Sequence, residues 1–253
     1  MTEPFLIIVL VAFVLAFMDN TMGMGYGTVL TAILISLGFE PLEAVPAILL
    51  SGTINGLFIS LAHHIAGNID FDWKDAPNLK ITFFLAGLGI IGVALSIGLA
   101  LSLPPHTVKL YIGAVVLSMG ALTLLRSKIK TSFSWKKISL VGLLAAFNKT
   151  ITGGGYGPLA TAGQIISGVD SKKSVAITAL SESMISVLAI IAYLLGGVVF
   201  NIGLLVFLTF GALLSVPLSA YVVKNIEVKN HNRAIGIATI LLGAYAVFHM
   251  FFS

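Results

Sequence analysis

DNTMGMGYG at residues 19–27 and KTITGGGYG at residues 149–157 are the two stretches that decide the fold of this chain. They align without a gap at an offset of 130 residues, and each lies inside a long apolar region. Clustered glycines interrupt a helix, because glycine loses much conformational freedom there and readily adopts dihedral angles that other residues avoid. The chain is therefore expected to contain two related halves, each beginning with a glycine-broken helix.

The duplication extends beyond the two loops. Phe17, Thr31, Gly38, Val45 and Ser51 all recur 130 residues later. After the polar stretch at 70–80 the offset becomes 123, and it continues to the end of the chain. We expect a first repeat at 1–126, a basic cytoplasmic linker at 127–137 and a second repeat at 138–253.

The composition indicates a chain whose solvent is lipid. Of 253 residues, 58% are hydrophobic and 9% are charged, whereas a soluble domain carries about 25% charged residues. No cysteine is present, which excludes disulfides and thiolate chemistry. We therefore expect a multi-pass protein of the cell (plasma) membrane.

Six apolar runs are long enough to cross ~30 Å of hydrocarbon as helices. These runs are 44–67, 81–103, 108–125, 175–200, 202–223 and 234–252. The glycine-broken regions at 5–39 and 138–169 are instead divided into short arms. The expected arms are Phe5–Met18 with Thr28–Phe39, and Ile138–Asn148 with Pro158–Val169. Arms of this length favour re-entrant helical hairpins over full spans.

The distribution of basic residues predicts how the halves are oriented. Cytoplasmic loops of membrane proteins carry an excess of Lys and Arg. If each broken region crosses once, the 14 Lys and Arg divide almost evenly between the two faces. If each forms a hairpin, 12 face the cytoplasm, Lys109 lies outside and Lys149 lies within a hairpin. We therefore predict an all-α integral membrane protein of two inverted repeats, each a glycine-broken re-entrant hairpin followed by three transmembrane helices.

Two hairpins that enter from opposite faces bring their tips together near the midplane, and this predicts an anion site. The return arms begin near Thr28 and Pro158, and helix N-termini present free amides and partial positive charge. The expected ligands are backbone amides at the glycines and neutral polar side chains nearby. They are Asn20, Thr21, Gly23, Gly25, Thr150, Gly153, Gly154, Gly155 and Gln164. The alternative is that the glycines only let helices pack closely.

Three charged residues lie within the apolar regions, where ionisable groups are costly and usually functional. Lys149 precedes the second loop and is expected to neutralise an anionic substrate or to cap the first half-helix. Asp19 occupies the equivalent position of the first repeat. It is expected to pair with Lys149 or to carry a proton. Glu182 lies about 12 Å from the nearest cytoplasmic lysines along its helix, and is a second candidate for proton coupling.

Other chemistry is poorly supported by the sequence. His63 and His64 lie near Asp70 and Asp72, but the end of a span at the interface explains them better than a metal site. No convincing nucleophilic triad or set of metal ligands is present. The sequence predicts no enzyme activity, no cofactor and no nucleic-acid partner, and it leaves homo-oligomers open.

GMGYG at 23–27 and GGGYGP at 153–158, each followed by Gly38 or Gly168 and an alanine- and serine-rich span, resemble the TauE/SafE sulfite exporter (TSUP) family. The resemblance covers essentially the whole chain. It implies a secondary transporter that exports sulfite, organosulfonates or related anions, coupled to protons. The alternative from the residues is an ion channel, because GYG also occurs in re-entrant potassium filters. A membrane scaffold is a third reading.

The predicted topology is open to a direct test. Reporter tags inserted after Glu40 and after Lys173 are expected on opposite faces of the membrane, because the two hairpins open in opposite directions. Accessibility to an impermeant label measures this. Labelling of both tags from one face would contradict the inverted arrangement.

Overall fold

We analysed a computed structural model of the chain. It describes residues 3–39, 41–71, 77–100, 117, 121, 132–152, 155–195 and 197–252. Over this part of the chain the regular structure is α-helical, and no strand occurs. The expected span at 108–125, apart from residues 117 and 121, and the first part of the expected linker, 127–131, lie outside the described residues.

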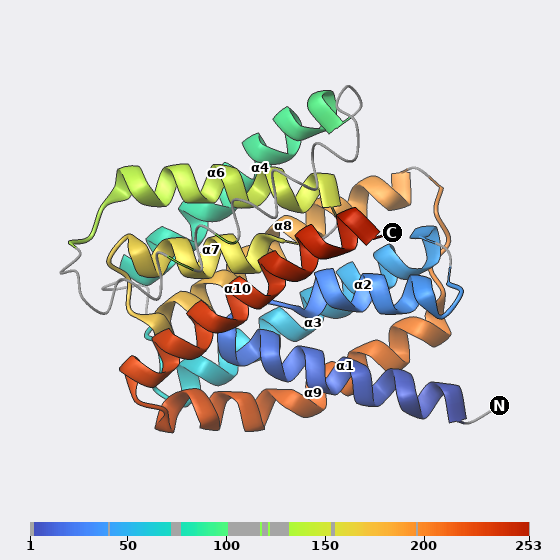
Figure 1. Cartoon of the computed structure of the whole chain (residues 1–253), viewed down its shortest axis with the longest axis horizontal. Coiled ribbons are helices and arrows are strands. Elements are labelled where there is room, and N and C mark those ends of the chain that lie inside the picture. The colour runs from blue at the N-terminus through green and yellow to red at the C-terminus, as the bar shows by residue number, and fades with distance from the viewer. Residues whose placement is uncertain are drawn as a thin grey trace.

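The described helices form a layered bundle (Figure 1). Their bounds are α1 Glu3–Met22, α2 Tyr26–Ser36, α3 Pro41–Ile65, α4 Pro77–Ala100, α6 Trp135–Thr152, α7 Tyr156–Ile166, α8 Ser171–Leu195, α9 Ile202–Asn225 and α10 Val228–Phe252. Among the described residues, three stretches are long and apolar enough to cross a membrane by length and composition, namely 43–65, 171–195 and 202–225. Shorter apolar stretches lie at Leu6–Met22 and Pro77–Gly92.

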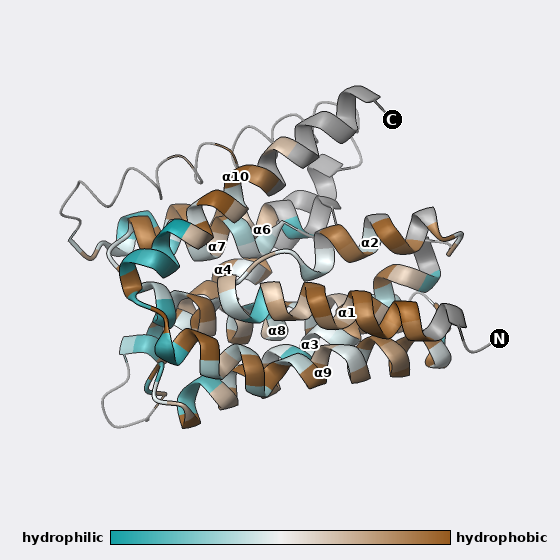
Figure 2. Ribbon diagram, turned by 60° about the horizontal axis from the view of Figure 1, so that its bottom comes forward, coloured by the Kyte–Doolittle hydropathy of each residue, from teal (hydrophilic) through white to brown (hydrophobic). Residues whose placement is uncertain are grey.

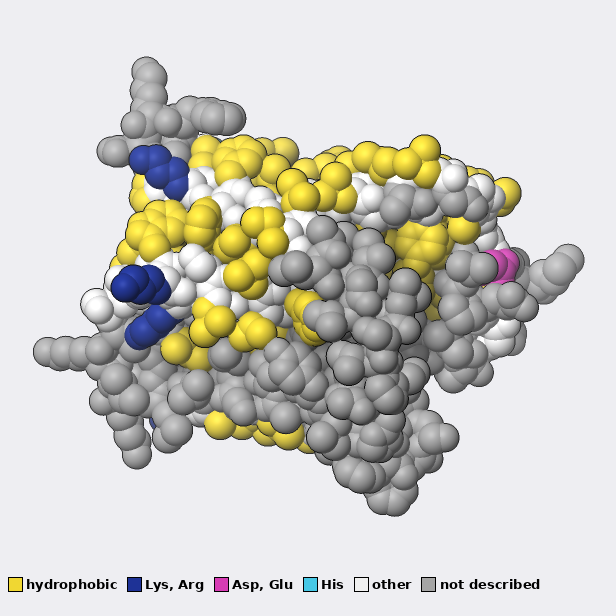
Figure 3. Space-filling view, turned by 90° about the horizontal axis from the view of Figure 1, so that it is seen from above, with side chains coloured by type: hydrophobic (Ala, Val, Ile, Leu, Met, Phe, Trp, Pro, Cys, Tyr) yellow, Lys and Arg dark blue, Asp and Glu magenta, His cyan; other side chains and the backbone are white. Residues whose placement is uncertain are grey.

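The outer surface of the bundle suits a lipid environment. Large apolar side chains such as Ile65, Leu195 and Val199 are more than three-quarters exposed, and hydrophobic residues cover the middle of the helices (Figure 2). On the face shown in Figure 3, the visible Lys and Arg side chains gather at one end and an acidic side chain lies at the other. Apolar surface between polar ends is the pattern of a protein that spans a bilayer.

The helix interruptions are shorter than the sequence suggested. Helix α1 continues to Met22, so Asp19 is helical, and positive φ angles begin at Gly23 (72°) and Gly25 (117°). The second interruption likewise follows Thr152, and Gly155 has φ 79°. The expected breaks at Asp19 and Lys149 were therefore wrong, because the conformations that end these helices need glycine rather than a polar residue.

The two arms of each hairpin are consequently unequal. The entering helices have 20 and 18 residues, whereas the return helices α2 and α7 have 11 each. At 1.5 Å per residue a return helix is about 16 Å long, half of the hydrocarbon thickness. In Figure 1, α1 enters and α2 returns at the end that holds the N-terminus, while α6 and α7 open toward the other end.

The two interruptions touch each other. A Cβ added to Gly157 would overlap the carbonyl oxygen of Gly23 and lie 3.0 Å from the Cα of Met24. The hydroxyl of Thr161 on α7 also donates to the Gly23 carbonyl at 3.1 Å. The backbones of the two hairpins therefore meet directly at this point.

The C-terminal end of α1 is capped by side chains from other helices. The last carbonyls of a helix lack partners within it. His63 Nε2 lies 3.0 Å from the Asn20 carbonyl oxygen, and His231 Nε2 lies 2.6 Å from that of Thr21. These two buried imidazoles, from α3 and α10, fix the end of α1 beside the glycine break.

The contact between the hairpins predicts a large effect of a single methyl group. Gly157→Ala is expected to lower the free energy of unfolding by about 1–3 kcal/mol, because the new Cβ overlaps backbone rather than a movable side chain. Thermal unfolding in detergent measures the loss. Gly87→Ala is the matched control, since a Cβ at that helical position meets nothing within 4 Å. Equal stability of the two variants would contradict the close contact.

Candidate functional site

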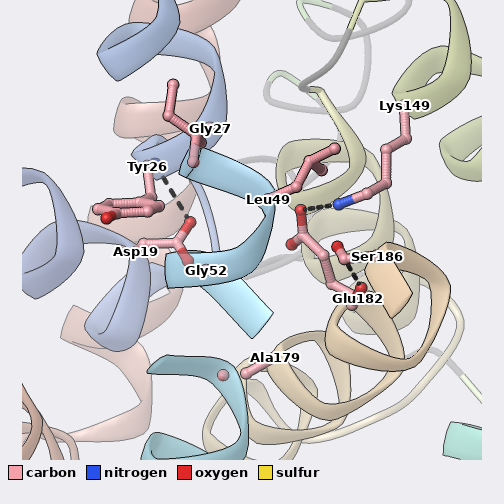
Figure 4. Close-up of a pocket in the computed structure, with 11 residues that line it drawn as sticks. Asp19, Tyr26, Gly27, Leu49, Gly52, Lys149, Ala179, Glu182 and Ser186 are labelled. Atoms are coloured by element: carbon pink, nitrogen blue, oxygen red, sulfur yellow. Dashed lines mark hydrogen bonds and ion pairs between the residues drawn. The ribbon is translucent and has the colours of Figure 1, made fainter. Parts of the chain in front are cut away.

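A small pocket lies beside the first glycine break and receives side chains from both halves of the chain (Figure 4). Its lining residues are Asp19, Tyr26, Gly27, Ile48, Leu49, Gly52, Gly56, Lys149, Ala179, Glu182 and Ser186. The cavity volume is about 40 Å³, and one water needs roughly 10–15 Å³ by the same kind of measure. The pocket therefore suits a ligand of a few heavy atoms.

An ion pair lies in one wall of this pocket. The ammonium of Lys149, on α6, donates to the Glu182 carboxylate, on α8, at 2.7 Å. The Lys149 side chain is 7% exposed and that of Glu182 is 26% exposed. The ammonium also lies 5.8 Å from the centroid of the Tyr156 ring, within cation–π range. Lys149 is thus held by an acid and an aromatic face at the edge of the cavity.

Asp19 reaches the same pocket but has a different partner. Its carboxylate accepts from the backbone N–H of Tyr26 at 3.4 Å, at the start of α2 (Figure 4). The expected pairing of Asp19 with Lys149 was therefore wrong. An acid is unfavourable at the C-terminal end of α1 and favourable at a helix N-terminus, and the tight glycine turn brings the N-terminus of α2 within its reach.

Both repeats contribute equivalent positions to the pocket. Positions 19 and 149, 49 and 179, 52 and 182, and 56 and 186 are related by the 130-residue offset, and all eight residues line the cavity. The chemistry at these positions differs between the halves, since glycines at 52 and 56 correspond to Glu182 and Ser186. The pocket therefore has related walls of unequal charge.

A tyrosine–serine pair recurs in each half and was not among the predicted site residues. The Tyr26 hydroxyl lies 2.8 Å from Ser51 Oγ, and the Tyr156 hydroxyl lies 3.0 Å from Ser181 Oγ. All four side chains are buried. Both residues recur at the 130-residue offset, so the repeat alignment was the sequence signal that could have found this pair.

Several expected ligands lie away from the pocket. Asn20 exchanges hydrogen bonds with Asn55 and donates to Ser215. Thr21 donates to the carbonyl of Phe17, within its own helix. The residues Asn20, Thr21, Gly23, Gly25, Gly155 and Gln164 do not line the pocket. Gly153 and Gly154 lie outside the described residues, as does the side chain of Thr150.

The contacts of His63 and His64 are hydrogen bonds and an ion pair within the protein, and they do not form a metal site. His63 Nδ1 accepts from the Asn68 amide at 2.9 Å while Nε2 faces the end of α1. His64 Nδ1 lies 3.9 Å from an Asp70 carboxylate oxygen at the exposed end of α3. Asp72 lies outside the described residues. Among the residues that are described, no group of three or more His, Asp or Glu side chains could hold a metal ion.

Comparison with known proteins places this architecture in a family. The family described as Sulfite exporter TauE/SafE matches residues 8–246, which is nearly the whole chain. The chain belongs to the TauE/SafE family. It is also 26% identical over 241 residues to the "Probable membrane transporter protein YtnM" of Bacillus subtilis (strain 168). That alignment covers 90% of this chain and 75% of the relative.

Membership of the TauE/SafE family confirms two expectations from the sequence. The chain is a multi-pass membrane protein, and it is a transporter. The matched region includes both glycine interruptions and every residue that lines the pocket. The pocket therefore lies within the part of the chain that matches the TauE/SafE family.

The Lys149–Glu182 pair predicts strong energetic coupling. Lys149→Met and Glu182→Gln should each lower the free energy of unfolding, on the order of 1–3 kcal/mol, because each leaves a partly buried polar or charged group without its partner. The double variant should lose less than the sum of the two. Chemical unfolding of all four proteins gives this cycle, and additive losses would show that the pair is not coupled.

Proposed function

We propose that the chain is a secondary transporter of small sulfur-containing anions, namely sulfite or organosulfonates. It exports them in exchange for, or together with, protons. The anion binds in the pocket beside the glycine interruptions. Family membership supports the transporter class, and the observation that carries the anion site is the buried ammonium of Lys149 at the edge of a small cavity. A buried charge in a membrane protein is costly and therefore usually serves function.

Two groups of the pocket could attract an anion, namely the Lys149 ammonium and the N-terminus of α2. In this structure each is paired with a carboxylate of the protein. Glu182 binds the Lys149 ammonium at 2.7 Å. Asp19 accepts from the first amide of α2, where a helix N-terminus carries partial positive charge. An anionic substrate would take the place of one or both carboxylates. The two acids thus act as internal substitutes for the substrate when it is absent.

This competition links anion binding to protons. With Asp19, Glu182 and Lys149 all ionised, the pocket carries one net negative charge, and an entering anion would add another. Repulsion at close range in a medium of low dielectric is strong. Protonation of a carboxyl group removes that repulsion and releases its positive partner. We therefore assign proton coupling to Asp19 and Glu182, and expect anions to bind more tightly as the pH falls.

Alternating access follows from the arrangement of the halves. We propose that they are inverted repeats. The opposite openings of the two hairpins, the basic residues at one end and the equivalent positions on both walls of the pocket support this. In such transporters one repeat rocks against the other around a fixed site. The size of the cavity favours an anion as small as sulfite over bulky sulfonates.

The ion-channel alternative has little support. A potassium filter needs a row of carbonyl oxygens that replace the hydration shell of the ion. Tyr26 and Gly27 instead begin helix α2, and Tyr156 and Gly157 begin α7. Their carbonyl groups therefore point along the axis of a helix and do not line a pore.

The anion site predicts distinct effects of its lysine and its acid. In Glu182→Gln, sulfite should still raise the unfolding temperature of the purified protein, with a weaker dependence on pH. Adding Lys149→Gln to that variant should abolish the shift, because the amide pair retains a hydrogen bond but supplies no positive charge. A thermal-shift panel of sulfite, sulfate, thiosulfate and sulfonates measures binding, and flux in proteoliposomes measures transport.

Lys136→Gln provides the control for nonspecific loss of a positive charge, since Lys136 is exposed at the start of α6. It should respond to sulfite like the unaltered protein. Sulfite binding or flux that survives removal of Lys149 would exclude this lysine from the mechanism.

A further inference from the structure

A second polar cluster lies beside the glycine contact, and none of its residues lines the anion pocket. It consists of Thr161 and Gln164 on α7 and Thr178 on α8, all at most 1% exposed. The Gln164 amide donates to Thr178 Oγ1 at 2.8 Å, and the Thr161 and Thr178 hydroxyls lie 2.9 Å apart. Thr161 also donates to the Gly23 carbonyl at 3.1 Å. The cluster thus extends to the backbone of the first interruption.

One oxygen of this cluster is unsatisfied. Gln164 Oε1 is buried and has no hydrogen-bond partner among the described residues. Buried polar atoms are nearly always paired, so an unpaired acceptor calls for an explanation such as a bound ion or water. The amide group of Gln164 is held through its nitrogen, which leaves the oxygen as a potential ligand.

The first repeat provides an internal comparison. The positions equivalent to Gln164 and Thr178 are Leu34 and Ile48, and both belong to the apolar core of the first half. Thr31, the equivalent of Thr161, donates to the Gly27 carbonyl of its own helix. Apolar side chains therefore satisfy the packing of this fold at these positions. Packing alone therefore does not explain why Gln164 and Thr178 are polar.

We propose that this cluster binds a small monovalent cation, Na⁺. Its ligands would be Gln164 Oε1, the hydroxyl oxygens of Thr161 and Thr178, and the Gly23 carbonyl oxygen. Hard cations prefer such oxygen ligands. The four named ligands are all neutral, so a divalent ion would keep most of its charge uncompensated, which is costly in the protein interior.

The position of the cluster also favours a cation. Gly23 directly follows the last residue of α1, where the helix dipole contributes partial negative charge. The neighbouring carbonyls of Asn20 and Thr21 face His63 and His231, whereas the Gly23 carbonyl faces the cluster. Carbonyls of broken helices serve as sodium ligands in other membrane transporters. A cation here would link the end of α1 to α7 and α8, and so hold the two interruptions together.

The proposal goes beyond anion transport and does not depend on which anion is carried. Its first test is the unfolding temperature of the full-length protein in detergent, in NaCl and in choline chloride at equal ionic strength. Na⁺ is expected to raise the unfolding temperature by a few degrees, as a ligand that binds the folded state does. The absence of a difference between the two salts would overturn the proposal.

The second test transplants the residues of the first repeat. The variant Gln164→Leu with Thr178→Ile should fold, because Leu34 and Ile48 pack at the equivalent positions, and it should lose the response to Na⁺. Gln164→Leu alone serves the same purpose if the double variant does not fold. Retention of the full sodium shift in the folded variant would also overturn the proposal.

Thr209→Val is the matched control, since the Thr209 hydroxyl on α9 is another buried group without a partner among the described residues. It should keep the sodium shift. Sulfite binding is measured in choline buffer in parallel, so that failure of the anion site and failure of the cation site give different results.

Discussion

The structure depends on satisfying the backbone groups that two helix interruptions release in an apolar surrounding. Such groups have no water to bond in lipid, and irregular backbone is tolerated only where protein covers it. Here the end of α1 meets His63, His231 and Thr161, which come from three different helices. The start of α2 meets Asp19. Side chains from distant parts of the chain therefore converge on the backbone groups at the end of α1 and the start of α2. The pocket lies beside this point.

The two halves of the chain share sequence at a 130-residue offset but differ in the chemistry that they bring to the pocket. Lys149 occupies the position of Asp19, and Glu182 occupies that of Gly52. A symmetric pocket with two lysines or two aspartates would concentrate like charges, whereas the observed set places opposite charges in contact. The halves differ in the same way at Leu34 and Ile48, whose equivalents in the second half are Gln164 and Thr178. The second half thus supplies the ion pair of the pocket, while the first supplies Asp19, Tyr26, glycines and apolar walls.

The sequence was sufficient for the helical membrane class, the family and the presence of two glycine breaks, because hydrophobicity, glycine motifs and the repeat offset can be read from the residues alone. It also drew attention to Asp19, Lys149 and Glu182, since charges in apolar segments stand out, and the structure brings these three to one pocket. It did not predict that Lys149 pairs with Glu182, because this depends on how α6 and α8 pack. Nor did it separate Asn20, which bonds side chains of α3 and α9, and Thr21, which bonds its own helix, from the residues of the pocket. Helix ends were misplaced by four residues at Asp19–Met22, where polar residues resemble a loop but remain helical.

The tyrosine–serine pairs constrain how the molecule can move. Tyr26 bonds Ser51 on α3, and Tyr156 bonds Ser181 on α8, so each return helix is fastened to the next helix of its own half. The Tyr26 hydroxyl also donates to the Leu208 carbonyl of α9 at 3.5 Å, so the first pair is anchored to both halves of the chain. Tyr26 and Tyr156 are the first residues of their return helices, and these bonds therefore hold the start of each helix beside its glycine break. Any rearrangement that moved a return helix away from its neighbour would have to break a buried hydroxyl pair, which is costly in an apolar surrounding.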